Sequence, residues 1–375
     1  MPVIDITKAP FNASASEPDI LPKLQAAVSA IGADGGEIFI PDTFNVSGML
    51  TLPNTASGYL GIKLRGSGRG SGLKASASFS GDAIIKALGG CSGVENMDIS
   101  CESIAPRAIW SIGPAQGFRS KFKDIHVTHA TVEAIRVEGP GDYLIDDFHT
   151  NSCALAVHHA GDAKNSVINA LYVTGGDGVV FSSSLGSCEG VTLSNSHILP
   201  TGGHGAVNGG VGVMVLGANG LQIVHSWIDC CKNMAIWAPS FSNNRGVKLV
   251  DLWMASDTGK CVLWEAGTDL AIDLAQCENA SPNVAQISLP ASELGKINGV
   301  TITNSVFSDV LNIGNVGVYA SRVRGMSIIN NRFRNRGTSI AESNGADNII
   351  SLNRWTHAPA SVSPSTQVSN NIGAL

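Results

Sequence analysis

The chain has 375 residues and an unusually small share of charged side chains. Asp, Glu, Lys and Arg make up 14% of it, against roughly 25% in ordinary globular proteins. The 43% of hydrophobic residues excludes a disordered chain. The net charge of −6 leaves no basic surface that would release phosphate counterions, so we expect no nucleic-acid partner.

Targeting and redox signals are equally sparse. No apolar run reaches the roughly 18 residues that a membrane span needs. The amino terminus lacks the basic and apolar regions of a signal peptide, so we expect synthesis and assembly in the cytoplasm. The eight cysteines include no CxxC pair, which predicts buried thiols rather than a zinc site or a disulfide framework. We expect no metal and no cofactor.

The first predicted element is a helix over residues 22–31, after an arm over residues 1–17. Leu24, Ala27, Val28 and Ile31 share one face of this helix, and Gly32 ends it. The strand Glu37-Ile-Phe-Ile40 follows. Residues 18–41 therefore read as a helix and first strand that cover one end of the domain.

A repeat begins in the first half of the chain and becomes clear from Val167 onward. Its copies start at Val167, Val191, Leu221, Val247, Leu270, Val300, Met326 and Ile349, which are 24, 30, 26, 23, 30, 26 and 23 residues apart. Such a period indicates a solenoid whose coils each need a stacked neighbour to complete a core.

One coil shows how the chain folds. Positions one and three are apolar and lie on one face of a short strand, position five is often Asn, which suits a turn, and position eight is apolar again. A third apolar patch follows, such as Cys261-Val-Leu263. Three short strands per coil predict an all-β fold, a single-stranded right-handed parallel β-helix over residues 42–357, with residues 358–375 as a tail or terminal cap.

Position seven predicts an outward column of stacked side chains. Its members are His197, Trp227, Trp253, Gln276, Val306, Arg332 and Trp355. Sugar rings pack on aromatic faces beside polar groups, so we expect a glycan to bind Trp227, Trp253, His197, Gln276 and, from position five, His225. A subunit interface or a covering loop would also explain an outward Trp column.

Carboxylates near this column are candidates for catalysis. Asp229 and Glu278 stand at position nine, two coils apart and hence about 10 Å from each other, and Asp251 stands at position five. Inverting glycoside hydrolysis uses two carboxyl groups at such a separation. Ordinary solvated acids are the alternative interpretation.

A second acidic group comes from earlier coils. Asp146 and Asp147 are expected near Asp124, His126 and His149, where stacked oxygen ligands would suit Ca²⁺. Lys123 or Arg136 would then be at hand as a base. Solvated corners of the solenoid are the alternative.

The opening of the chain resembles the opening of pectate-lyase-superfamily β-helices. The resemblance rests on the helix, on Gly35-Gly-Glu-Ile-Phe-Ile-Pro41, and on Ile62-Lys-Leu-Arg-Gly-Ser-Gly68. The acidic Gly-Asp-Gly segment that usually precedes the helix is replaced by Asn12-Ala-Ser-Ala-Ser16. The superfamily includes phage tailspike domains, polysaccharide lyases and epimerases.

This resemblance, most of all to tailspike domains, implies two kinds of function. The first is a virion-associated spike, fibre or decoration protein that adsorbs to host cell-surface polysaccharide. It would be a homotrimer in contact with other virion proteins, with or without depolymerase activity. The second is a free polysaccharide lyase, glycoside hydrolase or epimerase. The missing signal peptide and the lack of a complete catalytic motif favour the first.

Overall fold

The predicted fold class is confirmed. The computed structural model is an all-β parallel β-solenoid of about 11 turns with, in the part that it describes, a single short α-helix near the amino terminus. The described residues are 2–54, 61–88, 90–112, 120–139, 142–161, 164–182, 188–257, 260–279, 284–308, 314–334, 337–357 and 360–373. Two compact units are present: unit 1 (Met1–Val179, Ser183–Val191 and Gly203–Val207) and unit 2 (Val180–Ser182, Thr192–Gly202 and Asn208–Leu375).

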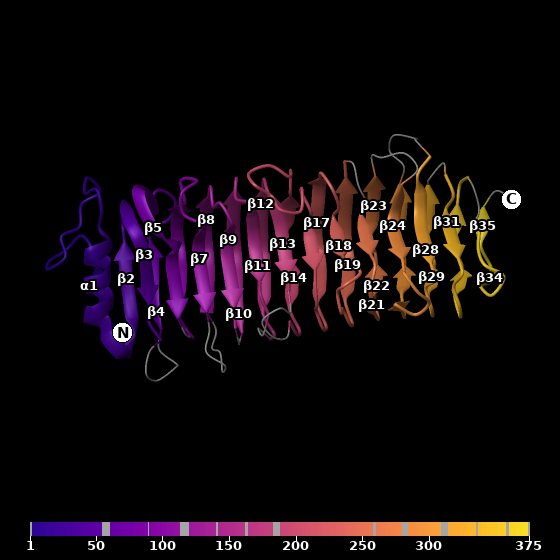
Figure 1. Ribbon diagram of the computed structural model, residues 1–375, viewed down its shortest axis with the longest axis horizontal. Coiled ribbons are helices and arrows are strands. Elements are labelled where there is room, and N and C mark those ends of the chain that lie inside the picture. The colour runs from indigo at the N-terminus through magenta and orange to yellow at the C-terminus, as the bar shows by residue number, and fades with distance from the viewer. Residues whose placement is uncertain are drawn as a thin grey trace. The chain divides into compact units, whose positions relative to one another are not determined.

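Unit 1 contains the helix and the first strands (Figure 1). Its elements are β1 (Val3–Asp5), α1 (Leu21–Ile31), the 3-10 turn η1 (Gly32–Asp34), β2 (Gly36–Ile40), β3 (Thr43–Leu52), β4 (Ile62–Gly66), β5 (Gly72–Leu88), β6 (Gly93–Ser100), β7 (Arg107–Ile112), β8 (Ser120–Thr128), β9 (Glu133–Glu138), β10 (Tyr143–Asn151), β11 (Leu155–His159), β12 (Val167–Thr174) and β13 (Asp177–Phe181), the last of which has residues in both units.

Two parallel ladders run through unit 1. One follows β1, β2, β4, β6, β8, β10 and β12, and the other follows β3, β5, β7, β9 and β11. Inward residues of the first ladder, such as Ile38, Leu64 and Val94, are fully buried one above the other. Each coil therefore buries its apolar positions only because its neighbours stack on it.

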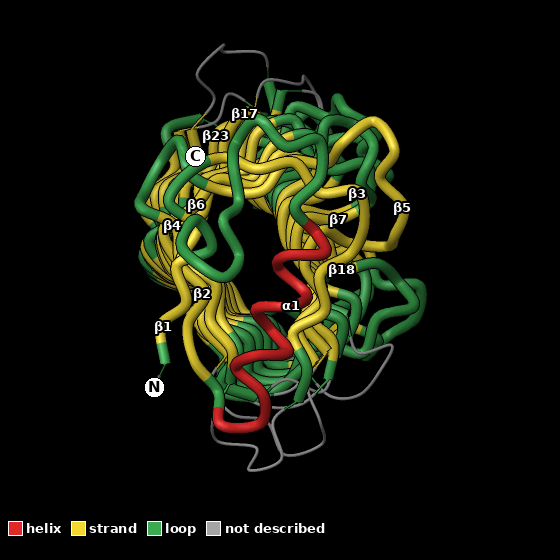
Figure 2. The backbone as a smooth tube through the Cα atoms, turned by 90° about the vertical axis from the view of Figure 1, so that its left-hand side faces the viewer, coloured by secondary structure: helices red, strands yellow, loops and turns green. Residues whose placement is uncertain are grey.

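Helix α1 covers the end of unit 1, as Figure 2 shows in red. Leu24, Ala27, Val28 and Ile31 are buried against β2 and β3, which confirms the predicted apolar face. Asp19 fastens the start of the helix, because its carboxylate accepts hydrogen bonds from the Leu21 amide and from the amide and hydroxyl of Ser47 in β3. Burial alone would raise the pKa of Asp19, but these bonds outweigh it and lower the pKa.

Unit 2 repeats three strands per coil. Its strands are β14 (Thr192–Ser194), β15 (His197–Leu199), β16 (Val213–Val215), β17 (Gln222–Cys231), β18 (Ile236–Ala238), β19 (Lys248–Ser256), β20 (Val262–Trp264), β21 (Gly267–Thr268), β22 (Ala271–Asp273), β23 (Gln276–Asn279), β24 (Ala285–Pro290), β25 (Ile297–Asn298), β26 (Thr301–Thr303), β27 (Val306–Ser308), β28 (Val316–Ser321), β29 (Ser327–Ile329), β30 (Arg332–Arg334), β31 (Ile340–Ser343), β32 (Ile349–Ser351), β33 (Arg354–Trp355), β34 (Gln367–Ser369) and β35 (Ile372–Gly373).

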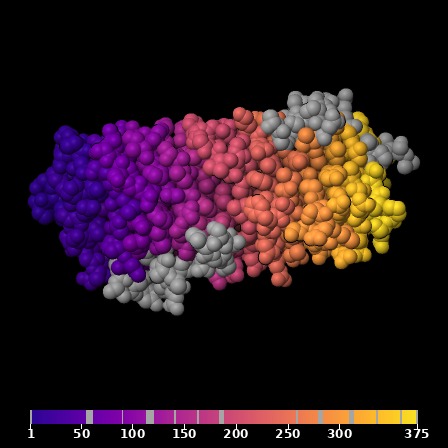
Figure 3. Space-filling model, in the orientation of Figure 1, coloured from indigo at the N-terminus to yellow at the C-terminus, as the bar shows by residue number. Residues whose placement is uncertain are grey.

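Each of the three strand positions in unit 2 forms its own parallel ladder, and a short pair, β21 and β25, lies beside them. The first ladder runs from β14 through β17, β19, β22, β26, β29 and β32 to β34. The second runs from β15 through β17, β19, β23, β27, β30 and β33 to β35. The third runs from β16 through β18, β20, β24 and β28 to β31. In the space-filling view, the residues of unit 2 run from pink through orange to yellow along the chain (Figure 3).

A left-handed corner separates the first two ladders of unit 2. The corner residue has a φ from 50° to 58°, and it is position five in the copies that start at Val191 to Met326 and position four in the copy that starts at Ile349. Asn residues take four of these corners, as the sequence predicts, whereas Leu274 and Leu352 occupy others against the steric preference of a branched side chain. The residues of this column are Asn195, His225, Asp251, Leu274, Asn304, Asn330, Leu352 and Asn370.

Buried polar side chains behind this corner form a ladder that the sequence repeat does not reveal. The Ser305 amide donates to Asn331 Oδ1 at 2.9 Å, and the Asn331 amide donates to Asn353 Oδ1 at 2.9 Å. Asn353 continues the ladder to Asn371 at 2.8 Å. These side chains accept hydrogen bonds from backbone N–H groups at the bend, and without them these N–H groups would be buried without a partner.

The apolar core of unit 2 lies inside the three ladders. The rings of Phe307 and Phe333 at position eight stack with centroids 4.6 Å apart and planes at 7°. Gly317 makes room for this stack, because a Cβ atom there would lie 2.6 Å from Phe333 Cδ1. The cysteines of the chain are free thiols, and all but Cys91 and Cys230 are buried, which agrees with the prediction.

The domain boundaries read from the sequence stay a prediction. The chain between residues 367 and 373 adds β34 and β35 to the first two ladders of unit 2. Within the described residues, no helix has the length and apolar character that would let it cross a membrane.

Candidate functional site

The strand register of unit 2 places the predicted aromatic column on one outward face. His197 pairs with Trp227, Trp227 with Trp253, and Trp253 with Gln276. These four residues, here called the aromatic wall, come from β15, β17, β19 and β23. Inward neighbours at position eight are fully buried, so the wall side chains point outward because strand residues alternate.

The rings of the aromatic wall are tilted rather than coplanar. Trp227 meets Trp253 at 4.9 Å and 75°, and meets His197 at 5.6 Å and 87°. Both are edge-to-face contacts, which stabilise aromatic pairs. Trp227 is 52% exposed, whereas Trp253 is half-buried and its indole nitrogen has no partner in the described structure. The aromatic surface available to a ligand therefore belongs mainly to Trp227.

Two of the predicted carboxylates lie in the outward column next to the wall. Asp229 follows Ile228 on β17, and Ile228 pairs with Met254 on β19. The next residue of β19, Ala255, pairs with Glu278 on β23. A bulge at Cys230, with φ of 50°, comes directly after Asp229. Asp229 and Glu278 are thus two rungs apart, about 10 Å along the solenoid. Glu278 also accepts a hydrogen bond from the Gln276 amide at 3.0 Å, so it orients a member of the wall.

His225 and Asp251 lie on the other side of the wall, at the left-handed corner. The imidazole Nδ1 of His225 is 2.7 Å from Asp251 Oδ2, and the two side chains are 62% and 59% exposed. An exposed pair of this kind adds little to stability. The structure therefore brings the predicted binding and catalytic residues to one face of unit 2, with polar groups on both sides of Trp227.

The column continues past the wall and corrects one sequence assignment. Gln276 pairs with Val306, Val306 with Arg332, and Arg332 with Arg354. Trp355 was expected in this column, but it pairs with Phe333 and is only 9% exposed. The last coil reaches its outward position one residue earlier than the repeat read from the sequence predicts, so Arg354 faces outward instead.

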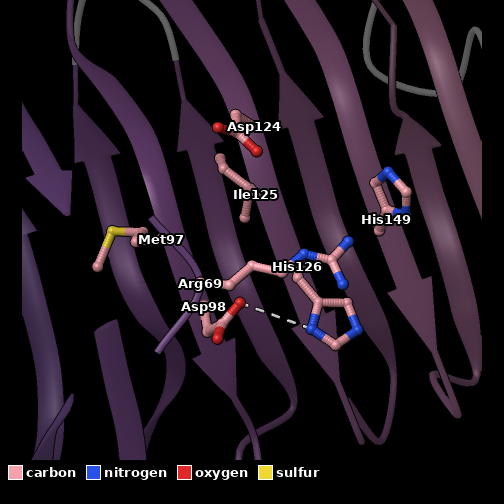
Figure 4. Close-up of a pocket in the computed structure, with 7 residues that line it drawn as sticks. All are labelled: Arg69, Met97, Asp98, Asp124, Ile125, His126 and His149. Atoms are coloured by element: carbon pink, nitrogen blue, oxygen red, sulfur yellow. Dashed lines mark ion pairs between the residues drawn. The ribbon is translucent and has the colours of Figure 1, made fainter. Parts of the chain in front are cut away.

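The acidic and histidine residues of unit 1 enclose a small pocket (Figure 4). Its volume is about 10 Å³, and its lining residues are Arg69, Met97, Asp98, Asp124, Ile125, His126 and His149. Burial lowers the pKa of His126, and the nearby charge of Asp98, whose Oδ1 lies 3.6 Å from Nδ1, offsets this only in part. Such a pocket holds about one water molecule, which excludes a sugar ring.

The side chains of Asp146 and Asp147, considered above as Ca²⁺ ligands, pair with other side chains of unit 1. Asp146 contacts Lys123 at 3.3 Å and accepts a hydrogen bond from Asn169 at 2.8 Å, while Asp147 contacts His149 at 3.0 Å. Within the described residues, no group of three His, Cys, Asp or Glu side chains is placed to hold a metal ion. Asp146 is therefore paired with Lys123 and Asn169, and Asp147 with His149.

A charge cluster on β7, β9 and β11 was missed by the sequence analysis. Glu133 is 5% exposed, and its carboxylate contacts Arg107 at 2.5 Å, Arg136 at 3.0 Å and His158 at 2.6 Å. Burial would raise the pKa of Glu133, but hydrogen bonds and charges from His158 and Arg107 outweigh it and lower the pKa to about 2. Arg136, the suggested base, is held in this cluster and also contacts Glu138.

A signal for this cluster does exist in the sequence. The segment Glu133-Ala-Ile-Arg136-Val-Glu138 carries three charges in six residues of a chain that is only 14% charged. Arg136 and Glu138 alternate with the apolar Ile135 and Val137, which is the pattern of a strand with one polar face, whereas Glu133 falls on the buried positions. Pairing with Arg107 and His158 depends on the rung alignment, which the looser early copies of the repeat do not reveal.

Comparisons with known proteins concern the fold. No family model matches the chain, and no curated protein matches it by sequence. Among solved structures, the A-module of mannuronan C-5 epimerase AlgE4 from Azotobacter vinelandii aligns with a TM-score of 0.59 and 14% identity over 95% of this chain and 96% of its own. The tailspike protein gp49 from Pseudomonas phage LKA1 gives 0.62 and 10% over 94% of this chain and 76% of its own.

A third structure agrees with these two. The pre-mature gene product 12 of bacteriophage phi29 aligns with a TM-score of 0.67 and 13% identity over 96% of this chain and 54% of its own. Identities this low establish shared architecture and leave activity open. The opening motif and the coil repeat thus belong to a chain that has the β-helix fold of tailspike proteins and epimerase A-modules.

Proposed function

We propose that this chain binds polysaccharide along the outward face of unit 2, with Trp227 at the centre of the binding surface. The supporting observation is the aromatic wall, in which one half-exposed indole lies beside Gln276, Glu278 and the His225–Asp251 pair. An exposed aromatic face packs against the C–H groups of a sugar, while adjacent amide and carboxylate groups bind its hydroxyls. Tailspike structures of the same fold support a glycan as the ligand.

The setting that we propose is a phage or phage-like particle. In this role the chain is a spike, fibre or decoration protein that adsorbs to host cell-surface polysaccharide as a homotrimer, in contact with other virion proteins. The tailspike structures of the same fold and the binding surface of unit 2 support this assignment. The location in a virion and the trimer are both parts of the proposal.

The first experiment removes the exposed indole. Trp227→Ala should weaken binding to the recognised polysaccharide about 30-fold, because an anchoring aromatic at a binding surface contributes about 2 kcal/mol. Binding is measured by surface plasmon resonance on immobilised host polysaccharides. Phe241→Ala is the matched control, since Phe241 is 76% exposed in the same unit and lies outside the wall. Equal affinity of both variants would refute the role of Trp227.

The oligomeric state separates glycan binding from a subunit interface. Trp227→Ala combined with Trp253→Ala should abolish adsorption to cells and leave the mass measured by light scattering at that of the trimer. Dissociation into monomers would assign the aromatic wall to the interface instead. Trp253 is included because its ring supports Trp227 from the adjacent strand.

Cleavage of the bound polysaccharide is a second candidate function. The column that holds Asp229 and Glu278 favours it, because two carboxyl groups about 10 Å apart come close to the spacing of inverting hydrolases. Asp251 would assist as a third acid beside His225. A free lyase, hydrolase or epimerase is the alternative to a virion protein, and the epimerase module of the same fold supports it.

The cleavage hypothesis is tested separately from binding. Host capsule or lipopolysaccharide is incubated with the protein, and the products are separated by size and analysed by mass spectrometry. Asp229→Asn and Glu278→Gln should each abolish product formation while the polysaccharide still binds. If the unaltered protein binds its polysaccharide and yields no shortened chains, the protein is a binder only.

A further inference from the structure

An outward pocket of unit 2 lies beyond the aromatic wall. It has a volume of about 430 Å³ and is lined by Asn330, Asn331, Arg332, Leu352, Arg354, Asn370 and Ile372. Small-molecule sites occupy about 300–1,000 Å³, so this pocket has room for a sugar residue. It lies along the left-handed corner, between the position-five column and the position-seven column.

Arginine side chains dominate the charge of this pocket. Arg332 and Arg354 are exposed and lie on paired positions of β30 and β33, about 4.8 Å apart in backbone spacing. Arg334 is exposed on the same strand as Arg332. No ion pair or side-chain hydrogen bond in the described part of the chain involves any of these three guanidinium groups. The paired Arg residues therefore repel each other, and no ion pair with a described residue compensates this repulsion.

The absence of acidic groups is local rather than general. Segments 330–334, 352–357 and 370–373 contain three Arg and no Asp or Glu, in a chain whose net charge is −6. Three other exposed Arg residues of unit 2 have partners: Arg245 lies 3.8 Å from Asp269, Arg324 lies 3.9 Å from Asp347, and Arg322 donates to the Ser292 carbonyl at 2.7 Å. Among the described Arg residues of unit 2, those of this pocket and Arg334 thus have guanidinium groups that are free to bind an external anion.

The remaining lining favours a sugar acid over a bare anion. Leu352 is 55% exposed and Ile372 is 63% exposed, so the pocket offers apolar surface to the C–H groups of a ring. Asn330 donates its amide to Asn304 Oδ1 at 2.7 Å, which fixes its orientation and points toward hydroxyl recognition. Guanidinium groups bind carboxylates through two parallel charge-assisted hydrogen bonds.

We propose that this pocket binds the carboxylate of an acidic sugar residue, which makes the ligand of unit 2 an anionic polysaccharide. The inference rests on the proposed polysaccharide-binding function and specifies its substrate class. Arg332 follows Trp253 by three rungs in one column, about 14 Å. An extended glycan along this column would contact Trp227 and Trp253 with one residue and Arg332 and Arg354 with another.

Affinity for matched probes tests the proposal. Hexasaccharides of mannuronate and of galacturonate are compared with the same hexasaccharides after reduction of every carboxyl group to a hydroxymethyl group, and with inorganic phosphate, by isothermal titration calorimetry. At least one uronate should bind about tenfold or more tightly than its reduced form, which corresponds to about 1.4 kcal/mol. Its affinity should fall with added salt.

Charge-neutral variants locate the site. Arg332→Gln with Arg354→Gln should remove the preference for the uronate and leave the weaker binding of the reduced form unchanged. Arg245→Gln with Arg324→Gln changes the net charge equally on the same unit, so it should leave the preference intact. Circular dichroism and thermal unfolding of both double variants confirm that each is folded.

The outcomes separate this inference from the proposed function. Equal binding of uronate and reduced probes, or failure of the unaltered protein to bind either uronate, would overturn the acidic-sugar assignment. A preference that survives the Arg332 and Arg354 substitutions would place carboxylate recognition elsewhere. Binding of phosphate as tight as that of the uronate would reduce the pocket to a simple anion site. Loss of all glycan binding on Trp227→Ala alone tests only the proposed function.

Discussion

Removing the charge of Glu133 should destabilise unit 1 in a strongly pH-dependent way. Glu133 is 5% exposed and forms contacts with Arg107, Arg136 and His158. Its ordinary pKa of 4.5 falls to about 2 in the folded protein. The folded state therefore favours the carboxylate. Glu133→Gln replaces it with a neutral side chain, which leaves Arg107 without its carboxylate partner and Arg136 with Glu138 alone.

The size of the effect follows from the pKa. A lowering of roughly 2.5 pKa units at about 1.4 kcal/mol each gives about 3 kcal/mol. Because the folded pKa is lowered, this contribution is fully present above pH 4.5 and is lost as the pH falls toward 2. Glu133→Gln should thus be about 3 kcal/mol less stable than the unaltered protein at pH 7, and nearly as stable at pH 2.

Urea unfolding followed by far-ultraviolet circular dichroism at pH 7, 4 and 2.5 measures the difference. Glu189→Gln is the control, because Glu189 contacts Lys164 at 3.3 Å while both side chains are largely exposed. An exposed pair should change the free energy of unfolding by less than about 1 kcal/mol. A deficit of Glu133→Gln that stays constant from pH 7 to pH 2.5, or that equals the control, would refute the electrostatic reasoning.

Three further predictions concern the core and the corners. Phe333→Ala should lower the free energy of unfolding by about 3–5 kcal/mol, since it removes a fully buried ring stacked on Phe307; a loss below about 1 kcal/mol in urea unfolding would contradict this packing. Leu274→Asn should stabilise unit 2 by up to about 1 kcal/mol, because Leu274 holds a φ of 54° that Asn tolerates better, and a lower melting temperature would count against it. Burial lowers the pKa of His159 to about 3. As the pH falls from about 6.5 to 3, this residue should therefore lower the free energy of unfolding by up to about 1.4 kcal/mol per pH unit. His159→Gln should flatten that slope.

Much of the fold could be predicted because apolar residues recur at fixed positions of the repeat. Positions three and eight carry Ile, Leu, Phe or Met in most copies, and the same residues form the fully buried columns of unit 2. The capping helix could be predicted in the same way, because Leu24, Ala27, Val28 and Ile31 follow helical spacing. All four are buried in the structure. Hydrophobic burial depends on local pattern, which a single sequence displays.

Polar partnerships were harder to predict because they depend on which residues share a rung. Arg354 rather than Trp355 faces outward, since the last coil shortens the spacing by one residue. Glu133 and His158 are 25 residues apart and meet only through the alignment of β9 with β11. The inner ladder of Ser305, Asn331 and Asn353 was hidden for another reason: its residues look like surface polar groups until the bend encloses them.

The left-handed corner at position five has a consequence for how such a protein changes over time. Because one residue per coil makes the bend, the side chains on either side of it face outward at a fixed step while the core behind them stays the same. A substitution at position seven changes the side chain that one rung presents and leaves the register of its neighbours unchanged. The outward surface of unit 2 can therefore change one rung at a time during evolution, while the solenoid behind it is kept.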